Sequence, residues 1–388
     1  MRRILYGALA LIVILLPMAG RLAFNHFDPT FFIVAGKQFV NKRYLPYPIS
    51  LILRTGYDGQ FYFKSAWDLS DPTEKAMRYD SPQYRKQRIF YPVVVSLVAL
   101  RNINLIPFSM IFVNCLCLIL LWWIFAKICV SNAIPWGYSL LPVMYSGLQM
   151  SLGRDLVEPL ETLLIIVLLQ FGMSNMILSC LLTTLALLTK ETTLIFLLPI
   201  SALTLWTTFL SRQKKHWSSY FWIILPYALF MAWHIFIERR LGFSSVDQGS
   251  SNFAFPLLGL VSGFLQFINN VIAQNVLMYG IFSSLHYVLL AIYLISLVIF
   301  IFPLIKTAWQ EKFKAHYAEI AWLAWLIFSL FFSIKIYEDD WSFGRVFSAF
   351  ASISFFILFS NKKIPNKKFI ALAIILFILM TVRLWLYV

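Results

Sequence analysis

Long apolar runs recur along the whole sequence, separated by short polar stretches. A helix needs about 20 mostly apolar residues to cross the hydrocarbon core of a bilayer. The runs are continuous rather than alternating in short strands, so they predict membrane-spanning helices and not the strands of a β-barrel. The clearest runs cover approximately residues 4–23, 106–128, 134–150, 156–172, 175–189, 192–210, 217–237, 282–305, 317–336, 344–360 and 368–387. They predict about eleven transmembrane helices.

Two further apolar segments are ambiguous. Residues 89–100 give only a dozen positions before Arg101, which is short for a span. Residues 253–272 are long enough, but proline, glycine, serine and asparagine interrupt them. We expect both segments to lie in the membrane interface or to dip into the membrane from its outer side.

Basic loops give the predicted orientation, because short cytoplasmic loops are enriched in Lys and Arg. By this rule the loops at 211–216, 306–316 and 361–368 are cytoplasmic, and so is the amino terminus with Arg2 and Arg3. The number of helices between these cytoplasmic positions agrees with the orientation only if neither ambiguous segment crosses the membrane. The count then gives eleven spans, with the amino terminus inside and the carboxyl terminus outside.

Residues 24–105 would then form a long outer loop carrying interfacial helices. This loop contains eleven Lys and Arg against six Asp and Glu. Long loops translocate largely regardless of charge, so the basic excess does not contradict the orientation. The excess fits either contact with lipid headgroups or a binding surface for a phosphorylated substrate, and both interpretations stay open.

The composition agrees with one transmembrane domain spanning residues 1–388. Hydrophobic residues make up 60% of the chain and charged residues 13%, and the mean hydropathy is +0.77. These values exclude an ordinary soluble domain. The net charge of +15 fits loop and membrane-facing charge rather than nucleic-acid binding. The four cysteines show no metal-binding spacing, and residues 1–20 predict an uncleaved first helix rather than a secretory signal.

Acidic residues near the predicted spans fall in the outer connections. They occur at Asp58 and in residues 68–80, 151–161, 188–194 and 335–345. Ionisable groups at the membrane edge cost free energy unless they face a polar cavity or one another. We therefore expect these connections to line one shared, outward-facing cavity.

Each of these residues also has a simpler structural interpretation. Asp58 precedes a helical pattern and would serve as its N-cap. Arg154 and Asp155 would form a loop ion pair, and Glu158 would stabilise the start of the next helix through its dipole. A functional site is indicated only because all of these residues are expected on the same side of the membrane.

The same alternatives apply further along the chain. Lys190 and Glu191 would neutralise each other within the bundle, and Arg345 would extend its side chain to the interface. The aromatic residues after Asp58 would anchor an amphipathic helix in the interfacial belt, or they would pack on a sugar or an isoprenoid chain. These aromatic residues are Tyr57, Phe61, Tyr62 and Trp67.

Several motifs, taken in order, resemble a known superfamily. The motifs are "GYDGQFYF…RYDSPQYRKQRIFYP" in the outer loop, "SLGRDLVEPLETLL", "LLTKETTLIF" and "FGRVFSAF". Together they resemble the GT-C superfamily of polytopic glycosyltransferases, which use polyprenyl-phosphate-linked sugars. They are most similar to bacterial multi-spanning proteins of cell-surface glycopolymer formation. The resemblance covers residues 1–360, and its first motif is the most specific.

The resemblance implies roles for individual residues. An acidic residue in the first outer loop serves the superfamily as catalytic base or metal ligand, which matches Asp58. A second acidic position between the third and fourth core spans matches Asp155 and Glu158. The superfamily's acidic pair in the first loop is absent here, because Tyr57 and Gly59 flank Asp58. A divalent cation, Mg or Mn, held by Asp58 and Asp155 therefore stays an open expectation.

Outer-facing basic residues of the superfamily hold the donor phosphate, and Arg88, Lys190 and Arg345 are the matching candidates. We expect Arg88 to contribute a bidentate contact, since it lies nearest the apolar edge. The full set expected to bind substrate is Tyr57, Gln60, Tyr62, Arg88, Tyr91, Arg154, Lys190, Glu191 and Arg345.

The expected chemistry is inverting transfer of a sugar to a lipid or glycan acceptor of the cell envelope. A carboxylate would take the proton of the attacking hydroxyl, and a negative charge would favour the oxocarbenium-like transition state. An arginine, a lysine or a metal would stabilise the departing phosphate. The expected location is the bacterial inner membrane, with the site facing the periplasm or exterior.

Two other classes of function stay open. Many spans, intramembrane charges and interrupted segments also describe a transporter or flippase of lipid-linked glycans. That interpretation is disfavoured because the sequence has no inverted repeat and its ionisable residues fall on one face. A non-catalytic assembly partner of a surface-polymer machine would need no aligned carboxylates.

Overall fold

The apolar runs fold as helices, and strands in the described part of the chain are confined to one two-residue pair. The computed structural model describes residues 2–52, 55–70, 75–210, 218–242, 250–273, 277–311 and 316–386. The α-helices are α1 (Arg2–Phe24), α2 (Gly59–Asp68), α3 (Pro82–Lys86), α4 (Phe90–Val98), α5 (Ile106–Ser131), α6 (Ser146–Gly153), α7 (Glu158–Phe171), α8 (Met176–Thr189), α9 (Leu194–Leu210), α10 (Ser218–Leu241), α12 (Leu258–Ala273), α13 (Leu277–Gln310), α14 (Tyr317–Ser329), α15 (Ile334–Tyr337), α16 (Asp340–Val346), α17 (Ser348–Ser360) and α18 (Lys367–Leu386).

Short 3₁₀ helices and one strand pair connect these elements. The 3₁₀ helices are η1 (Pro29–Phe32), η2 (Lys42–Tyr44), η3 (Ile103–Leu105), η4 (Trp136–Leu140), η5 (Gly172–Ser174), η6 (Glu191–Thr193) and η7 (Ser250–Asn252). Strands β1 (Ala35–Gly36) and β2 (Leu51–Ile52) pair in parallel.

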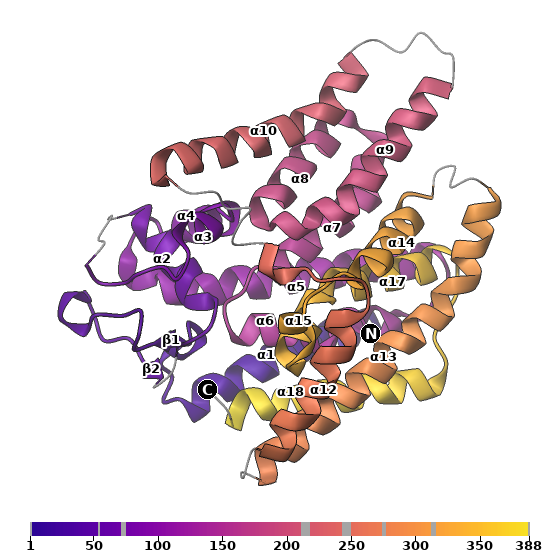
Figure 1. Cartoon of the computed structure of the whole chain (residues 1–388). Coiled ribbons are helices and arrows are strands. Elements are labelled where there is room, and N and C mark those ends of the chain that lie inside the picture. Colours follow the sequence, from indigo (N-terminus) through magenta and orange to yellow (C-terminus); the bar gives the residue numbers. More distant parts are fainter. Residues whose placement is uncertain are drawn as a thin grey trace.

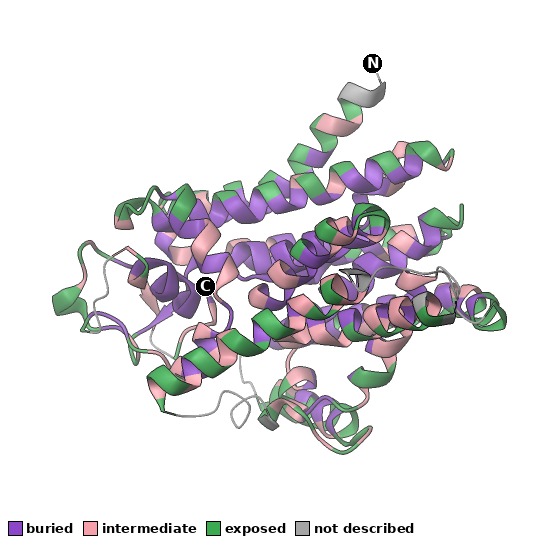
Figure 2. Ribbon diagram, turned by 90° about the horizontal axis from the view of Figure 1, so that it is seen from above, coloured by how far each residue is buried: buried purple, intermediate pink, exposed green. Residues whose placement is uncertain are grey.

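Five helical segments in the described ranges are long and apolar enough to cross a membrane. They are Leu5–Phe24, Ile103–Ser131, Tyr220–Leu241, Gly280–Gln310 and Lys367–Leu386. The pair α16–α17, bent by 45°, gives a sixth if it counts as one span. Shorter apolar helices lie beside them, and many large apolar side chains are exposed on their outward faces (Figure 2). The chain is therefore an all-α polytopic membrane protein.

Two predicted spans are broken by irregular backbone, and a third, 344–360, bends between α16 and α17. Residues 134–150 divide into η4 and α6, because Pro142 between them lacks the N–H that a continuing helix requires. Residues 317–336 divide after α14, where the backbone turns to bond with another segment: Ala254 N–H donates to the Phe331 carbonyl over 2.8 Å. The prediction of one continuous helix was wrong for both ranges.

The elements of residues 24–105 gather at one end of the helical bundle, where β1, β2, α2, α3 and α4 are labelled in Figure 1. Helix α2 packs inside the protein rather than in the membrane interface, since every residue from Gly59 to Trp67 is buried. The interfacial-belt interpretation of Phe61, Tyr62 and Trp67 was therefore wrong. Helix α4, with nine residues, is about 14 Å long and too short to span a bilayer.

The segment expected at 253–272 forms α12, which carries exposed apolar side chains on one face. Its other face packs closely on the backbone of residues 332–337. A β-carbon added at Gly259 would lie 1.9 Å from the Phe332 carbonyl oxygen, and one at Gly263 would lie 2.4 Å from the Tyr337 β-carbon. The two glycines allow this close approach.

Another glycine contact fixes α16, which carries residues of the candidate site. A β-carbon added at Gly147 of α6 would lie 2.2 Å from the carbonyl oxygen of Gly344 in α16. The Tyr145 hydroxyl donates to the same carbonyl over 2.8 Å. Helices α6 and α16 are therefore held in direct backbone contact.

Replacing Gly147→Ala should separate α6 from α16 and lower the free energy of unfolding by about 1–3 kcal/mol. Denaturation in mixed micelles would measure this change. Gly137→Ala is the matched control, because its added β-carbon would lie 3.6 Å from the Tyr6 ring, an ordinary contact distance. Equal stability of the two variants would contradict the close contact.

Candidate functional site

Two glycines fix the position of Asp58 at the end of the bundle that carries α2, α3 and α4. Gly56 has φ +76°, and a β-carbon there would lie 2.5 Å from the Gly36 nitrogen. A β-carbon at Gly59 would lie 2.3 Å from the carbonyl oxygen of Arg154. The "GYDG" turn therefore passes between two backbone segments that leave no room for side chains at its glycines.

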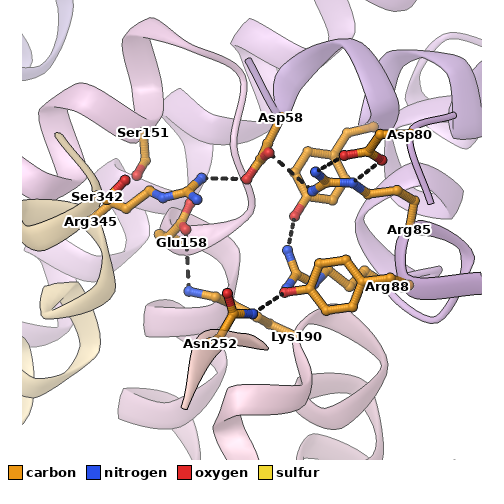
Figure 3. A network of polar contacts seen from close by, with 12 residues as sticks. Asp58, Asp80, Arg85, Arg88, Ser151, Glu158, Lys190, Asn252, Ser342 and Arg345 are labelled. Atoms are coloured by element: carbon orange, nitrogen blue, oxygen red, sulfur yellow. Dashed lines mark hydrogen bonds and ion pairs between the residues drawn. The ribbon is translucent and has the colours of Figure 1, made fainter. Parts of the chain in front are cut away.

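Asp58 occupies the N-cap position of α2, yet its side chain makes no capping hydrogen bond. The carboxylate instead pairs with two arginines. Its Oδ1 lies 3.0 Å from Nη1 of Arg85, and its Oδ2 accepts from Nη1 of Arg345 over 2.6 Å. Figure 3 shows Asp58 between these guanidinium groups, which come from α3 and α16. Helix capping, as the simpler role of Asp58, was wrong.

The two arginines determine the charge of Asp58. Burial alone would raise the pKa of the Asp58 carboxyl, but Arg85 and Arg345 outweigh it and hold that pKa well below its usual range. Burial also opposes the charge of Arg85, and Asp58 and Asp80 together raise the pKa of its guanidinium. Asp58 is therefore ionised at neutral pH, with 17% of its side chain exposed.

Arg85 shares its guanidinium between two carboxylates. Besides Asp58, it binds Asp80 through Nε at 2.9 Å and Nη2 at 2.6 Å. Arg85 thereby links the Asp58 carboxylate to the outer surface, where 34% of the Asp80 side chain is exposed.

Lys190 lies between two glutamates of α7. Its Nζ is 3.2 Å from Oε1 of Glu158 and 3.0 Å from Oε2 of Glu161. All three side chains are buried, with at most 6% exposed. The expected pairing of Lys190 with Glu191 is replaced by these contacts.

Glu191 pairs instead with Arg88. The guanidinium donates to Glu191 through Nε at 2.8 Å and Nη2 at 2.5 Å, a bidentate arrangement. It also donates through Nη1 to the Tyr62 hydroxyl over 2.9 Å and through Nη2 to the Tyr84 hydroxyl. Every nitrogen of the Arg88 guanidinium therefore has a protein partner.

These ion pairs define the charged cluster, in which five carboxylates meet four cations. Its members are Asp58, Asp80, Arg85, Arg88, Glu158, Glu161, Lys190, Glu191 and Arg345. The members labelled in Figure 3 come from the turn before α2, from α3 and the residues beside it, from α7, from α16 and from the connection after α8. Glu158 also interacts electrostatically with Arg345, which connects the lysine pairs to the Asp58 pairs.

Three further residues predicted in the site lie around it. Tyr57 lies between two guanidinium groups, with its ring centroid 4.4 Å from Cζ of Arg154 and 5.0 Å from Cζ of Arg345. Gln60 supports the turn, because it accepts from Gly36 N–H at 3.0 Å and donates to the Thr55 carbonyl at 2.8 Å.

Tyr91 and Asp155 lie outside the charged cluster. Tyr91 is fully buried, and its hydroxyl accepts from Asn114 over 3.0 Å. Asp155 has φ +51° and is fully buried, and within the described ranges neither carboxylate oxygen has a hydrogen-bond partner. Its main opposite charge is Arg21 of α1 rather than a member of the cluster.

These environments do not fit a divalent cation shared by Asp58 and Asp155. Both oxygens of Asp58 already bind arginines, whereas Asp155 interacts with Arg21. Across the described ranges, no group of three or more His, Cys, Asp or Glu side chains is arranged to hold a metal ion. A second acidic group near Asp58 is Glu158, which reaches it only through Arg345.

The sequence reasoning missed a second buried centre around Asp340. Asp340 accepts from Ser283 over 2.9 Å, lies 2.6 Å from Nδ1 of His286 and is bound by Arg383. His286 and Arg383 occur within apolar runs, and such placement is itself a signal of a functional or paired group. Arg85 was also missed as a site residue, although it lies three residues before Arg88.

Comparison with protein-family models, with curated proteins and with solved structures finds no match to this chain. The site is therefore interpreted from its own geometry and chemistry.

Removing the buried cation of the cluster should destabilise the protein strongly. Lys190→Met would leave Glu158 and Glu161 buried without their partner, and we expect the free energy of unfolding to fall by about 3–5 kcal/mol. Lys363→Met, at an exposed position, is the control and should change it by less than about 0.5 kcal/mol. Both would be measured by denaturation in mixed micelles. Equal stability of the two variants would show that the buried pairs do not form.

Proposed function

We propose that this chain is a membrane glycosyltransferase of the cell envelope. It moves a sugar from a polyprenyl-phosphate donor to a lipid or glycan acceptor. The observation that supports this most is the Asp58 carboxylate, held by Arg85 and Arg345 at 3.0 and 2.6 Å and still partly exposed. A carboxylate beside two guanidinium groups provides both a proton acceptor and a phosphate-binding charge.

In this proposal the chain crosses a bacterial inner membrane eleven times, counting the broken segments 134–150 and 317–336 and the bent pair α16–α17. The end of the bundle that carries the charged cluster faces the periplasm or exterior. The apolar helices α5, α10 and α13 then leave the cluster at the membrane edge, where a lipid-linked donor and a polar acceptor meet.

The acceptor hydroxyl attacks the anomeric carbon of the donor, with inversion. The new bond forms between that carbon and the acceptor oxygen as the bond to the phosphate oxygen breaks. The hydroxyl proton goes to Asp58, and the lipid leaves as polyprenyl phosphate. In this proposal the negative charge of Asp58 also stabilises positive charge on the sugar ring.

A carboxylate held by two arginines is a weak base, because both lower its pKa. The donor phosphate resolves this difficulty by competing for the same cation. When Arg345 turns its charge toward the phosphate, its pair with Asp58 weakens and the carboxylate becomes more basic. Donor binding would thereby activate the base, and the protonated Asp58 would later return to its ionised state by losing the proton to water.

Arg345 is better suited to the donor phosphate than Arg88. Its Nη1 binds Asp58, but within the described part of the chain its buried Nε has no hydrogen-bond partner. Arg88, in contrast, donates from all three nitrogens to Glu191, Tyr62 and Tyr84. We therefore assign Arg345 to the phosphate and Arg88 to the support of the cluster. The resemblance to GT-C glycosyltransferases agrees with a basic residue in this role.

Replacing Asp58→Asn should lower turnover by about 10²–10⁴-fold in folded, purified protein, because the amide cannot accept the hydroxyl proton. Release of polyprenyl phosphate from a lipid-linked sugar would measure it. Asp80→Asn is the control, since it removes another carboxylate from Arg85 and leaves Asp58 in place. Near-normal turnover of Asp58→Asn would exclude the residue as the base.

Arginine-to-lysine changes separate the two arginine roles. Arg345→Lys should raise the donor KM by about tenfold, because the ammonium is a point charge without the planar guanidinium fork that can face Asp58 and the phosphate at once. Arg88→Lys should reduce stability, while the folded protein keeps a normal donor KM. Steady-state kinetics on protein selected by size-exclusion chromatography would measure both. The reverse pattern of KM values would reassign the phosphate to Arg88.

A further inference from the structure

Three guanidinium groups and two aromatic rings form one continuous stack beside Asp58. The Tyr57 ring lies between Arg345 and Arg154, with centroid-to-Cζ distances of 5.0 and 4.4 Å. The Trp341 ring lies between Arg154 and Arg383, at 4.0 and 4.3 Å. Arg154 is thus enclosed by an aromatic ring on each side.

Helix α16 contributes both Trp341 and Arg345, which lie four residues apart and therefore about one turn apart on the same side of the helix. Tyr57 and Arg154 enter from the "GYDG" turn and from the end of α6. The stack therefore leaves α16 at Trp341, passes through Arg154 and Tyr57, and returns to α16 at Arg345.

The far end of the stack is fixed by the buried Asp340 centre. Arg383 of α18 binds Asp340, which also contacts His286 at 2.6 Å and Ser283 at 2.9 Å, both from α13. Asp340, His286 and Arg383 are each at most 1% exposed. Three helices thus hold the first guanidinium rigidly, and Trp341 rests on it.

Ring faces contribute to the positions of Tyr57, Trp341 and Arg345. Within the described ranges, the Tyr57 hydroxyl, the Trp341 indole N–H and Arg345 Nε are buried without hydrogen-bond partners. In the same ranges, the one hydrogen bond of the Arg345 side chain is donated by Nη1 to Asp58. A single hydrogen bond does not by itself fix the plane of a guanidinium, and the face of the Tyr57 ring supplies a further constraint. Stacking of guanidinium groups on aromatic faces is favourable, most of all when both are desolvated.

We propose that Trp341 and Arg154 are positioning residues that orient the Arg345 guanidinium toward the reacting phosphate through Tyr57. The inference rests on the proposed function, since Arg345 is the group there assigned to the donor. Neither Trp341 nor Arg154 touches the substrate. Their effect reaches the reaction by holding Tyr57 and thereby the plane of Arg345.

The first arm of the test needs no substrate. In protein with ¹⁵N-labelled arginine in nanodiscs, the side-chain Nε–H resonances of Arg154 and Arg345 report ring currents from the adjacent aromatic faces. Arg154→Lys and Arg345→Lys assign the two signals. Trp341→Leu should shift both resonances, because it removes one of the two rings that Arg154 contacts and the change passes through Tyr57 to Arg345. A shift of Arg154 alone would overturn the inference, since the stack would not transmit the change.

Trp325→Leu is the matched control. Trp325 is also buried, stacks on a ring at 4.5 Å, and has an indole N–H without a partner in the described part of the chain, but the ring it faces is Phe196. Trp325→Leu should leave both arginine resonances in place. If Trp325→Leu also shifts both arginine resonances, loss of any buried tryptophan disturbs the site, and the inference is overturned.

The second arm measures transfer in the folded fraction. Trp341→Leu should lower kcat about tenfold with the donor KM changed less, and Trp341→Phe, which restores an aromatic face, should recover most of the loss. Unchanged kcat in Trp341→Leu would contradict the positioning role. Normal turnover in Asp58→Asn, or absence of transfer by the unmodified protein, would instead show that the proposed function is wrong. In that case the resonance experiment still decides whether the stack holds Arg345.

Discussion

The ion pair between Asp58 and Arg345 joins residues 287 positions apart and holds the two ends of the sequence together at the site. Asp58 lies in the segment 24–105, and Arg345 lies on α16, the first helix of the bent pair α16–α17. Charged groups at the edge of an apolar bundle are stable only when opposite charges and hydrogen bonds accompany them. This constraint explains why the cations and carboxylates of the charged cluster occur as pairs and why four separate segments converge there.

Close backbone contacts bring the partners of these ion pairs within reach of one another. Gly56 and Gly59 let the loop approach residues 34–36 and the Arg154 carbonyl, while Gly147 lets α6 touch α16 at Gly344. The same approach brings Arg154 between Tyr57 and Trp341. Glycine contacts thus set the distance between elements, ion pairs neutralise the charges, and ring faces orient the guanidinium groups. Each of these effects concerns the same few residues around Asp58.

The sequence was sufficient to predict helices and a polytopic membrane protein, because long apolar runs have few other stable arrangements. It also grouped Asp58, Glu158, Lys190 and Arg345 in one expected site, and all four belong to the charged cluster. It did not predict which charges pair, since Lys190 binds two glutamates of α7 and leaves its neighbour Glu191 to Arg88. Such choices depend on side-chain directions after the helices pack.

Other differences have similarly local causes. Burial of α2 was not predicted, because its aromatic residues look the same in sequence whether they face lipid or protein. The position of Asp155 depends on a backbone φ of +51° that directs it away from the cluster and toward Arg21. The Asp340 centre draws on α13, α16 and α18, so no short motif could have shown it.

In the proposed function, lipid-linked sugar is cleaved and transferred at the Asp58 site. This can be tested by incubating the reconstituted protein with a panel of polyprenyl-phosphate sugars carrying a labelled sugar, together with envelope glycolipid as acceptor. We expect one donor to lose its label to the acceptor and to release an equal amount of polyprenyl phosphate. Donors that cross the bilayer intact, with no sugar transferred from any of them, would contradict it and indicate a transporter.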